Sequence, residues 1–323
     1  MKAIIPAAGI GKRLRPHTYN TPKVLLNVAG KPIISHIIDD IIDRGIGEIV
    51  VIVGYQGEKL RDYLTNNYKK KFSFVEQTER KGLGHAVGLG LEKDDEPVLI
   101  ILGDTIFDVD YKRILSLEKS AIGVTPVEDP RRFGIVELKD GRVINLVEKP
   151  DSPSSNLVIS GLYFIKNQGL LKKCIDRLVS ENIKTKGEYQ LTDALRLMLE
   201  MGEPIEIFDV RGWYDCGSKD SILETNRILL ERKTRYSPGG GSKIIRPVHI
   251  AATAVVVESI IGPYATIDEG AEIKGSIIRD SIIGKKAMIE NCNIEHSIIG
   301  SHAAVRGKRK ILNVGDYSEV EVE

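Results

Sequence analysis

The residues best suited to chemistry lie near the start of the chain, where an apolar run leads into a glycine-rich turn and a group of cations. Ile4 and Ile5 belong to the apolar run, and Gly9 and Gly11 stand in the turn. Four cations follow closely: Lys12, Arg13, Arg15 and Lys23. Glycines let a backbone approach an anion, while free N–H groups and fixed cations hold its charge. The stretch therefore predicts a phosphate-binding loop.

Two better-known phosphate-binding loops do not fit this stretch. A P-loop requires the string Gly-x-x-x-x-Gly-Lys-Ser/Thr, which is absent from the sequence. A Rossmann fingerprint requires a third glycine where Leu14 stands. An ordinary strand-to-helix turn is the remaining alternative, but such a turn has no need for a group of neighbouring cations.

The composition is that of a globular protein with balanced charge. The chain has 323 residues, a net charge of +1, 42% hydrophobic residues and 28% charged residues. This length accommodates a large domain and a smaller one, and the charge argues against nucleic acid as a partner. Three dispersed cysteines, Cys174, Cys216 and Cys292, fit a reducing compartment. We expect neither a signal peptide nor a membrane-spanning run, and therefore a cytoplasmic protein without a membrane partner.

Strands and helices are expected to alternate over the first hundred residues. Isoleucines within 32–44 form one wide apolar stripe, with Pro32 at the start of the expected helix and Gly45 at its exit. Residues 49–53 are continuously apolar, as in a parallel strand covered on both faces. The expected strands are 3–5, 49–53, 72–76 and 98–102, and the expected helices are 32–44, 58–68 and 84–92. This alternation predicts an α/β fold with a Rossmann-like, mixed open sheet.

A glycine-rich linker separates two predicted domains. Before it, residues 121–164 are rich in strand patterns, with turns at Asp129-Pro130 and Asp140-Gly141. Helices are expected at 170–179, 188–201 and 221–231, and a strand at 205–210. The polar stretch that follows contains Pro238-Gly239-Gly240-Gly241, a linker composition. The predicted division is a first domain over 1–231, a linker over 232–243 and a second domain over 244–323.

Beyond the linker, aliphatic residues recur every five or six positions. They are Val255, Ile261, Ile267, Ile273, Ile278, Ile283, Ile289, Ile294, Ile299 and Val305. Neither an α-helix nor an ordinary strand has this period, whereas a hexapeptide β-helix turns one aliphatic residue inward on each side of its triangular coil. Gly262, Gly284 and Gly300 follow such positions, where corners are expected. We predict a short left-handed parallel β-helix in the second domain.

The glycine-rich stretch is also the first of a series of motifs. Residues 9–23 resemble the pattern Gly-x-Gly-Thr-Arg-Leu-x-Pro-x-Thr-x-x-x-Pro-Lys of the sugar-1-phosphate nucleotidylyltransferases. The family order continues at Lys31-Pro32, Gln77, Gly82-Leu83-Gly84-His85-Ala86, Gly103-Asp104, Phe133-Gly134, Glu148-Lys149-Pro150, Ser160-Gly161-Leu162-Tyr163, the stretch 187–193 and Trp213-Tyr214-Asp215-x-Gly217. The resemblance covers residues 1 to about 230. Within the family, the sequence looks closest to the long-type glucose-1-phosphate thymidylyltransferases with a β-helix tail, and then to the bacterial glucose-1-phosphate uridylyltransferases.

The resemblance implies that the first domain transfers a nucleotidyl group from dTTP or UTP to a sugar 1-phosphate, with glucose 1-phosphate as the first expectation. The nucleophile is then an oxygen of the sugar phosphate. The second pKa of this phosphate group is about 6, so the oxygen is already ionised at neutral pH. No general base is needed, and catalysis consists of positioning and charge neutralisation. The family pattern assigns Arg13 to the pyrophosphate leaving group and Lys23 to the α-phosphate and the sugar phosphate. It assigns the triphosphate to the backbone around Ala8, Gly9, Gly11 and Lys12.

Two aspartates are the expected ligands of Mg²⁺. Asp104 ends an apolar strand, at the edge of an open α/β sheet where ligands bind. Asp215 stands far along the chain in a short motif of its own. Magnesium is a hard ion that keeps several waters and bridges phosphates. An isolated aspartate is usually a cap or turn residue, so the metal role rests on the resemblance.

The base and sugar sites are likewise implied by the family pattern. Gln77 carries a donor and an acceptor, which suit the edge of a pyrimidine, and Gly82 matches the family's backbone contact to that base. Glu148 is expected to accept from sugar hydroxyls and Lys149 to hold the sugar phosphate. Further expected sugar-site residues are Gly134, Gly161 and Tyr163. The structural alternatives are an exposed polar side chain for Gln77 and turn residues for the charged pair.

The sequence departs from the family pattern at three positions. Lys12 replaces a threonine, so a cation stands where a hydroxyl would contact phosphate. Thr105 replaces an asparagine, and Cys216 replaces a threonine. We expect Arg15 to be a structural cation of the loop, and His85 to be a structural or near-base residue and not an acid–base catalyst.

Two other functions compete with this one. The β-helix could carry an acyltransferase that acts on an amino-sugar phosphate, but its repeat is short and its histidines, His249, His296 and His302, are scattered. An assay with acetyl-CoA would discriminate the two. A regulatory protein with a decayed nucleotide fold would have lost the cations and carboxylates, which are all present. We expect the tail to serve assembly into a homo-oligomer. The sequence separates neither dTTP from UTP nor one sugar 1-phosphate from another.

Overall fold

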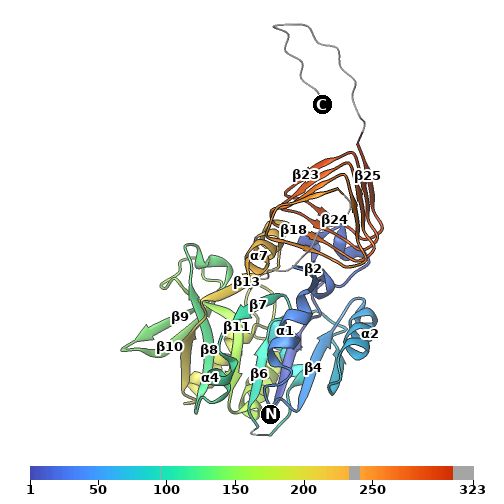
Figure 1. Cartoon of the computed structure of the whole chain (residues 1–323). Helices are drawn as coiled ribbons and strands as arrows, with labels where there is room; N and C mark the ends of the chain where they lie inside the picture. The colour runs from blue at the N-terminus through green and yellow to red at the C-terminus, as the bar shows by residue number, and fades with distance from the viewer. Residues whose placement is uncertain (95, 233–240, 308–323) are drawn as a thin grey trace. The chain divides into compact units, whose positions relative to one another are not determined.

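The computed structural model describes residues 1–94, 96–232 and 241–307, which form two compact units (Figure 1). The first unit contains Met1–Leu26 and Lys31–Ile222, and the second contains Asn27–Gly30 and the chain from Leu223 onward. Most of the predicted linker, 233–240, lies outside the described residues.

The first unit is built on a nine-stranded mixed sheet, as predicted. Its strand order is β10-β9-β11-β6-β1-β4-β5, with β8 pairing to both β11 and β12. The pairs of β1 with β4 and β6, of β4 with β5 and of β8 with β12 are parallel, and the remaining pairs are antiparallel. The strands are β1 Lys2–Pro6, β4 Glu48–Val53, β5 Phe72–Glu76, β6 Val98–Ile101, β8 Ser120–Pro126, β9 Gly134–Lys139, β10 Arg142–Glu148, β11 Leu157–Ile165 and β12 Ile205–Asp209.

Helices cover both faces of this sheet because successive side chains of a strand point to opposite faces. In β1, Ile4 packs into one core cluster, while Ala3 and Ile5 pack into the other. The cluster around Ile4 includes side chains of α3 Leu83–Gly90, α5 Gln168–Ser180 and α6 Leu191–Glu200. The opposite cluster includes side chains of α1 Ile33–Ile41, α2 Gly57–Asn67 and α4 Tyr111–Leu115. The predicted helix over 32–44 is thus confirmed at its start and is shorter at its end.

Several short elements lie outside the expected pattern. The strands β7 Thr105–Asp108 and β13 Gly212–Asp215 pair with each other as a separate antiparallel ribbon. The other two-stranded ribbon is β2 Asn27–Val28 with β3 Lys31–Pro32. Single 3₁₀ turns occur at η1 Lys12–Leu14, η2 His17–Tyr19, η3 Lys23–Leu25 and η4 Pro130–Arg132. These pieces are too short for hydrophobic periodicity to reveal them.

The second unit contains the predicted parallel β-helix. Three four-stranded sheets are stacked from consecutive coils, in the orders β14-β17-β20-β23, β15-β18-β21-β24 and β16-β19-β22-β25. The strands are β14 Lys243–Ile244, β15 Val248–Ile250, β16 Val255–Val257, β17 Ile260–Ile261, β18 Ala265–Ile267, β19 Glu272–Lys274, β20 Ile277–Arg279, β21 Ile282–Ile283, β22 Met288–Glu290, β23 Asn293–Glu295, β24 Ile298–Ile299 and β25 Ala304–Arg306. α7 Lys219–Glu231 precedes them along the chain.

The predicted inward positions are confirmed except at the first one. Val255 is 47% exposed, and its neighbour Val256 packs against the core of the β-helix. Val256 pairs with Ile273, Ile273 with Ile289 and Ile289 with Val305, which form one inward row. Because β16 is three consecutive valines, composition alone does not show which of them faces inward.

Within the described ranges, no helix combines the length and the apolar character that are needed to cross a membrane.

Candidate active site

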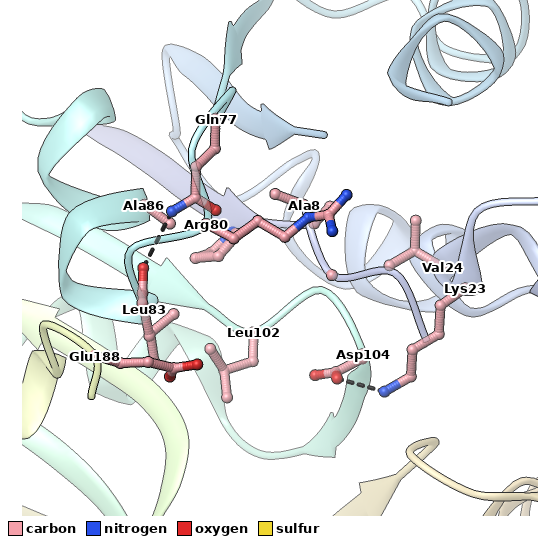
Figure 2. A pocket seen from close by; sticks show the side chains of 14 residues that line it. Ala8, Lys23, Val24, Gln77, Arg80, Leu83, Ala86, Leu102, Asp104 and Glu188 are labelled. Carbon is pink, nitrogen blue, oxygen red and sulfur yellow. Dashed lines mark hydrogen bonds and ion pairs between the residues drawn. The ribbon is translucent and has the colours of Figure 1, made fainter. Parts of the chain in front are cut away.

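A cavity of about 350 Å³ opens in the first unit at the carboxyl ends of β1 and β6 (Figure 2). This edge of an open α/β sheet is where ligands bind. Six of the predicted site residues line the cavity: Ala8, Gly9, Lys23, Gln77, Gly82 and Asp104. In Figure 2, Gln77 lies at one end of this group and the pair of Lys23 and Asp104 at the other. The structure therefore brings the predicted base residues and part of the predicted phosphate residues into one pocket. The predicted residues of the phosphate and metal sites that do not line it are Gly11, Lys12, Arg13 and Asp215.

The glycine-rich loop folds back on the residues that follow it. Gly11 adopts a left-handed backbone with φ 66°, and a Cβ there would lie 2.9 Å from Thr18 Cγ2 and 3.2 Å from Lys23 Cβ. The Thr18 hydroxyl donates to the Gly11 carbonyl at 2.8 Å. Gly9, in contrast, has only open space around the position of a Cβ. Gly11 is thus required by the fold of the loop, while Gly9 leaves room on the cavity side.

The cations of the loop differ in their surroundings. Lys12 and Arg13 lie in η1 and are exposed. The Arg15 guanidinium lies 4.9 Å from the centre of the Tyr19 ring, a cation–π contact that gives it a role within the loop. Lys23 is only 7% exposed, and its Nζ lies 2.5 Å from Asp104 Oδ2. A buried ammonium needs a counter-charge, and Asp104, whose side chain is 40% exposed, supplies it to Lys23.

The β7–β13 ribbon places the second aspartate, Asp215, near the backbone of Asp104. Asp215 stands opposite Thr105, the residue after Asp104. The Cys216 N–H donates to the Asp104 carbonyl at 3.0 Å, and this hydrogen bond joins the start of β7 to the end of β13. A Cβ on Gly217 would lie 2.7 Å from Asp215 Oδ2 and 2.8 Å from Arg13 Nη2. The backbone segments that carry the two aspartates are therefore adjacent, and Arg13 approaches Asp215 beside Gly217.

These donors fit a divalent cation that is shared with phosphates. Asp104 and Asp215 offer carboxylate oxygens, the ligands that Mg²⁺ prefers. Over the described ranges, no group of three histidines, cysteines and acidic residues forms a complete metal cage. A cation held by two carboxylates would take its remaining ligands from phosphate oxygens and water, as Mg²⁺ does in phosphoryl-transfer sites. Cys216 is fully buried beside them, and burial makes it a packing residue.

The amide of Gln77 has a definite orientation in the cavity. Its Nε2 donates to the Gly82 carbonyl at 3.1 Å and lies 3.1 Å from His85 Nδ1. An amide nitrogen has two hydrogens, and these two contacts use both. The Gln77 carbonyl oxygen is thereby left as the group that a ligand meets. Of the predicted donor and acceptor of Gln77, we therefore expect the acceptor to meet the base.

The orientation of Gln77 depends on a neutral His85. Nδ1 can accept from the amide only in the neutral imidazole. Burial, and then the positive charge of Lys81, lower the pKa of His85 below its ordinary 6.5, with Glu79 opposing. His85 is therefore neutral at pH 7 and becomes a cation as the pH falls through this lowered value.

We expect acidification to weaken nucleotide binding through His85. Protonated Nδ1 is a donor and repels the Gln77 amide hydrogens, so the carbonyl oxygen loses its orientation. The KM for the nucleotide, measured from about pH 8 to about pH 5, should rise at the acid end. His85→Asn keeps an acceptor that does not titrate, so its profile should lack this rise. Identical acid limbs in the two proteins would contradict the role of His85.

Three of the five predicted sugar residues lie together in the same unit. Glu148 ends β10 opposite Gly134 of β9, and Lys149 follows with its Nζ 3.1 Å from Glu148 Oε1. Gly161 adjoins the cavity, because its carbonyl accepts from the N–H of the cavity residue Leu102 at 3.0 Å. Tyr163 packs in the core, where burial and then the charge of Glu148 raise its pKa. In the described part of the chain, none of the five sugar residues lines the 350 Å³ cavity itself.

Three residues of this region were not predicted. Arg80 and Glu188 line the cavity, and Figure 2 shows the Arg80 guanidinium near Ala8, between the two ends of the site. Thr192 donates to Glu148. Glu188 and Thr192 belong to the motif over 187–193, which could have been used to find them, whereas nothing in the sequence singles out Arg80.

Comparisons with known proteins agree with this geometry. A family model described as "Nucleotidyl transferase" matches residues 2–232. The chain is similar to the bifunctional protein GlmU of Methanocaldococcus jannaschii, with 36% identity over 97% of this chain and 84% of that protein. It is also similar to the glucose-1-phosphate thymidylyltransferase of Streptomyces griseus, with 28% identity over 100% of this chain and 99% of that protein.

A solved structure shares the fold of the first unit. It is a Bacillus anthracis protein, assigned as a glucose-1-phosphate thymidylyltransferase and solved in complex with sucrose. It is 27% identical with a TM-score of 0.62, and the match covers 74% of this chain and 98% of that one. The family model spans more than half of the chain and contains the cavity with its cations and aspartates. This chain therefore belongs to the nucleotidyl transferase family, with a parallel β-helix after the nucleotidyltransferase fold.

Proposed function

We propose that this chain transfers a nucleotidyl group from dTTP or UTP to a sugar 1-phosphate, with glucose 1-phosphate as the first candidate, and releases pyrophosphate. One observation carries the proposal. A single cavity holds an oriented amide acceptor, Gln77, at one end and the Lys23–Asp104 pair at the other. A nucleotide has the same two features, a hydrogen-bonding base and a charged phosphate chain.

The orientation of Gln77 favours a base with an imide N–H. Its carbonyl oxygen can accept from N3–H of thymine or uracil. N3 of cytosine is itself an acceptor, so its lone pair would face the lone pairs of the Gln77 oxygen. A site that leaves a buried polar group unpaired rejects the wrong ligand strongly. One methyl group, by contrast, separates thymine from uracil and discriminates only by about 10-fold to 200-fold. We therefore expect both dTTP and UTP to be accepted.

The reaction that these residues support is an in-line displacement at the α-phosphorus. An oxygen of the sugar phosphate forms the new bond, the bond to the bridging oxygen breaks, and pyrophosphate leaves. The attacking oxygen is already ionised, so no side chain has to remove a proton. Lys23 would hold the α-phosphate against the incoming phosphate, and Arg13 would take charge on the leaving pyrophosphate. Asp104 and Asp215 would hold Mg²⁺, which supplies further neutralisation of phosphate charge.

A pyrophosphate-release matrix tests this proposal. The purified full chain is supplied with Mg²⁺, with one of dTTP, UTP, CTP, ATP or GTP, and with the 1-phosphates of glucose, galactose or N-acetylglucosamine. We expect turnover with dTTP and UTP and a lower kcat/KM for CTP, because N3 of cytosine cannot donate to the Gln77 oxygen. Silence across the matrix would remove the proposed function. A preference for CTP or a purine would remove the assignment of Gln77.

A further inference from the structure

The carboxylate of Glu148 is held by a residue that approaches it from another part of the fold. Glu148 ends β10, and its side chain is 9% exposed. Thr192, the second residue of α6, is 5% exposed and donates its hydroxyl to Glu148 Oε2 at 2.6 Å. The other carboxylate oxygen lies 3.1 Å from Lys149 Nζ. Each oxygen of Glu148 therefore has one partner, and the buried one is Thr192.

The neighbouring strand leaves room for this contact. Gly134 stands opposite Glu148 in the antiparallel pair of β9 and β10. A Cβ at this position would lie 2.7 Å from Thr192 Oγ1 and 3.0 Å from Glu148 Oε2. Either distance is too short for ordinary packing. A glycine at 134 is thus what allows the hydroxyl and the carboxylate to meet.

The backbone beside Glu148 is fixed independently of Thr192. Lys149 adopts φ 42°, a conformation uncommon for a residue with a side chain, and its N–H donates to the Phe133 carbonyl at 2.9 Å. Thr192 makes its bond to the end of the Glu148 side chain and not to this backbone. Loss of the hydroxyl should therefore change where the carboxylate points and leave the strand in place.

We infer that Thr192 is a positioning residue for the sugar side of the reaction, which rests on the function proposed above. Its hydroxyl fixes the Glu148 carboxylate so that the remaining lone pairs accept from hydroxyls of a sugar. A carboxylate that is held by a hydrogen bond on one oxygen and an ion pair on the other is preorganised for a neutral polyol, because little ordering is left for the ligand to impose. The nucleotide makes no use of this contact, so the effect belongs to the sugar phosphate alone.

Kinetics of Thr192→Val, Thr192→Ser and wild type test the inference. Valine has nearly the shape of threonine without the donor, and serine keeps the donor. We expect Thr192→Val to raise the KM for glucose 1-phosphate about 10-fold, as for a lost hydrogen bond to a charged group, with the KM for the nucleotide unchanged. Thr192→Ser should lie near wild type. If the valine variant fails to fold, Thr192→Ala gives the same comparison.

A matched control is Thr125→Val, which also loses a hydroxyl donor. Thr125 donates to the Val210 carbonyl at 2.7 Å, away from Glu148, so neither KM should change. A mutant cycle adds a second readout: on a Glu148→Ala background, which has no acceptor for the hydroxyl, Thr192→Val should cause little further loss, because the two residues act as a unit. Additive effects, equal rises in both KM values, or no recovery with serine would overturn the role of Thr192.

The outcome also separates this inference from the proposed function. An active wild type whose sugar-phosphate KM is unaffected by Thr192→Val removes the inference and leaves the function standing. A wild type that turns over no nucleotide with any sugar 1-phosphate removes both.

Discussion

Asp104→Asn should lower turnover by about 1,000-fold while the protein remains folded. Asparagine has the same shape, but it brings no charge to a metal ion and none to Lys23. In the wild type, Asp104 Oδ2 lies 2.5 Å from Lys23 Nζ, and the backbone of Asp104 is bonded to Cys216 next to Asp215. The substitution therefore removes one of the two proposed metal ligands and the partner of a buried cation. Pyrophosphate release under saturating substrates and Mg²⁺ measures the effect.

The control for this change is Asp176→Asn. Asp176 also pairs with a lysine, Lys172, but on the exposed surface of α5. An exposed pair of this kind contributes little, so both the rate and the melting temperature should stay at wild-type values. Asp104→Asn should melt below wild type, since it leaves the Lys23 ammonium buried without its counter-charge. A near-normal rate would remove Asp104 from the proposed metal site.

Gly82→Ala should damage both the nucleotide site and the stability of the first unit. Gly82 adopts φ 115°, a region open almost only to glycine, and a Cβ there would lie 2.5 Å from the Tyr189 carbonyl oxygen and 2.8 Å from the Tyr189 nitrogen. The contact is with backbone, which a rotamer change does not relieve. We expect a loss of about 3 kcal/mol in the free energy of unfolding and a melting temperature lower by about 5 °C or more.

The kinetic effect of Gly82→Ala should appear in the KM for the nucleotide. The Gly82 carbonyl accepts from Gln77 Nε2, so a shift of this backbone turns the amide that meets the base. Gly141→Ala is the matched control. Gly141 also has a positive φ, 75°, but it lies in the β9–β10 turn with no atom within 4 Å of an added Cβ. Gly141→Ala should shift the melting temperature slightly and leave both KM values unchanged. An equal loss in both variants would show that backbone strain alone explains the effect.

The elements with a long, regular pattern could be predicted from the sequence. Continuous apolar runs predicted β4 and β6 to within one residue of their observed ends, because a strand covered on both faces admits few polar residues. Aliphatic residues that recur every five or six positions predicted the β-helix, since each coil needs apolar side chains at the same inward positions. The one inward position that was wrong, Val255, lies in a run of identical residues. Short ribbons such as β7 with β13 were missed, because strands of four residues are too short to show a clear period.

The sequence by itself determined the chemistry available to this protein: a glycine-rich loop with cations, a glutamine, and two aspartates in the order of a nucleotidyltransferase. Only the tertiary structure decided how these groups meet. The β7–β13 ribbon places Asp215 opposite Thr105, the residue after Asp104. Gly82 and His85 both contact Nε2 of Gln77, which leaves its carbonyl oxygen for a ligand. Thr192 reaches Glu148 only because α6 packs against β10, with Gly134 leaving the space. The physical reason is that residue type fixes what a group can donate or accept, whereas its partner and direction depend on side chains that are distant in sequence.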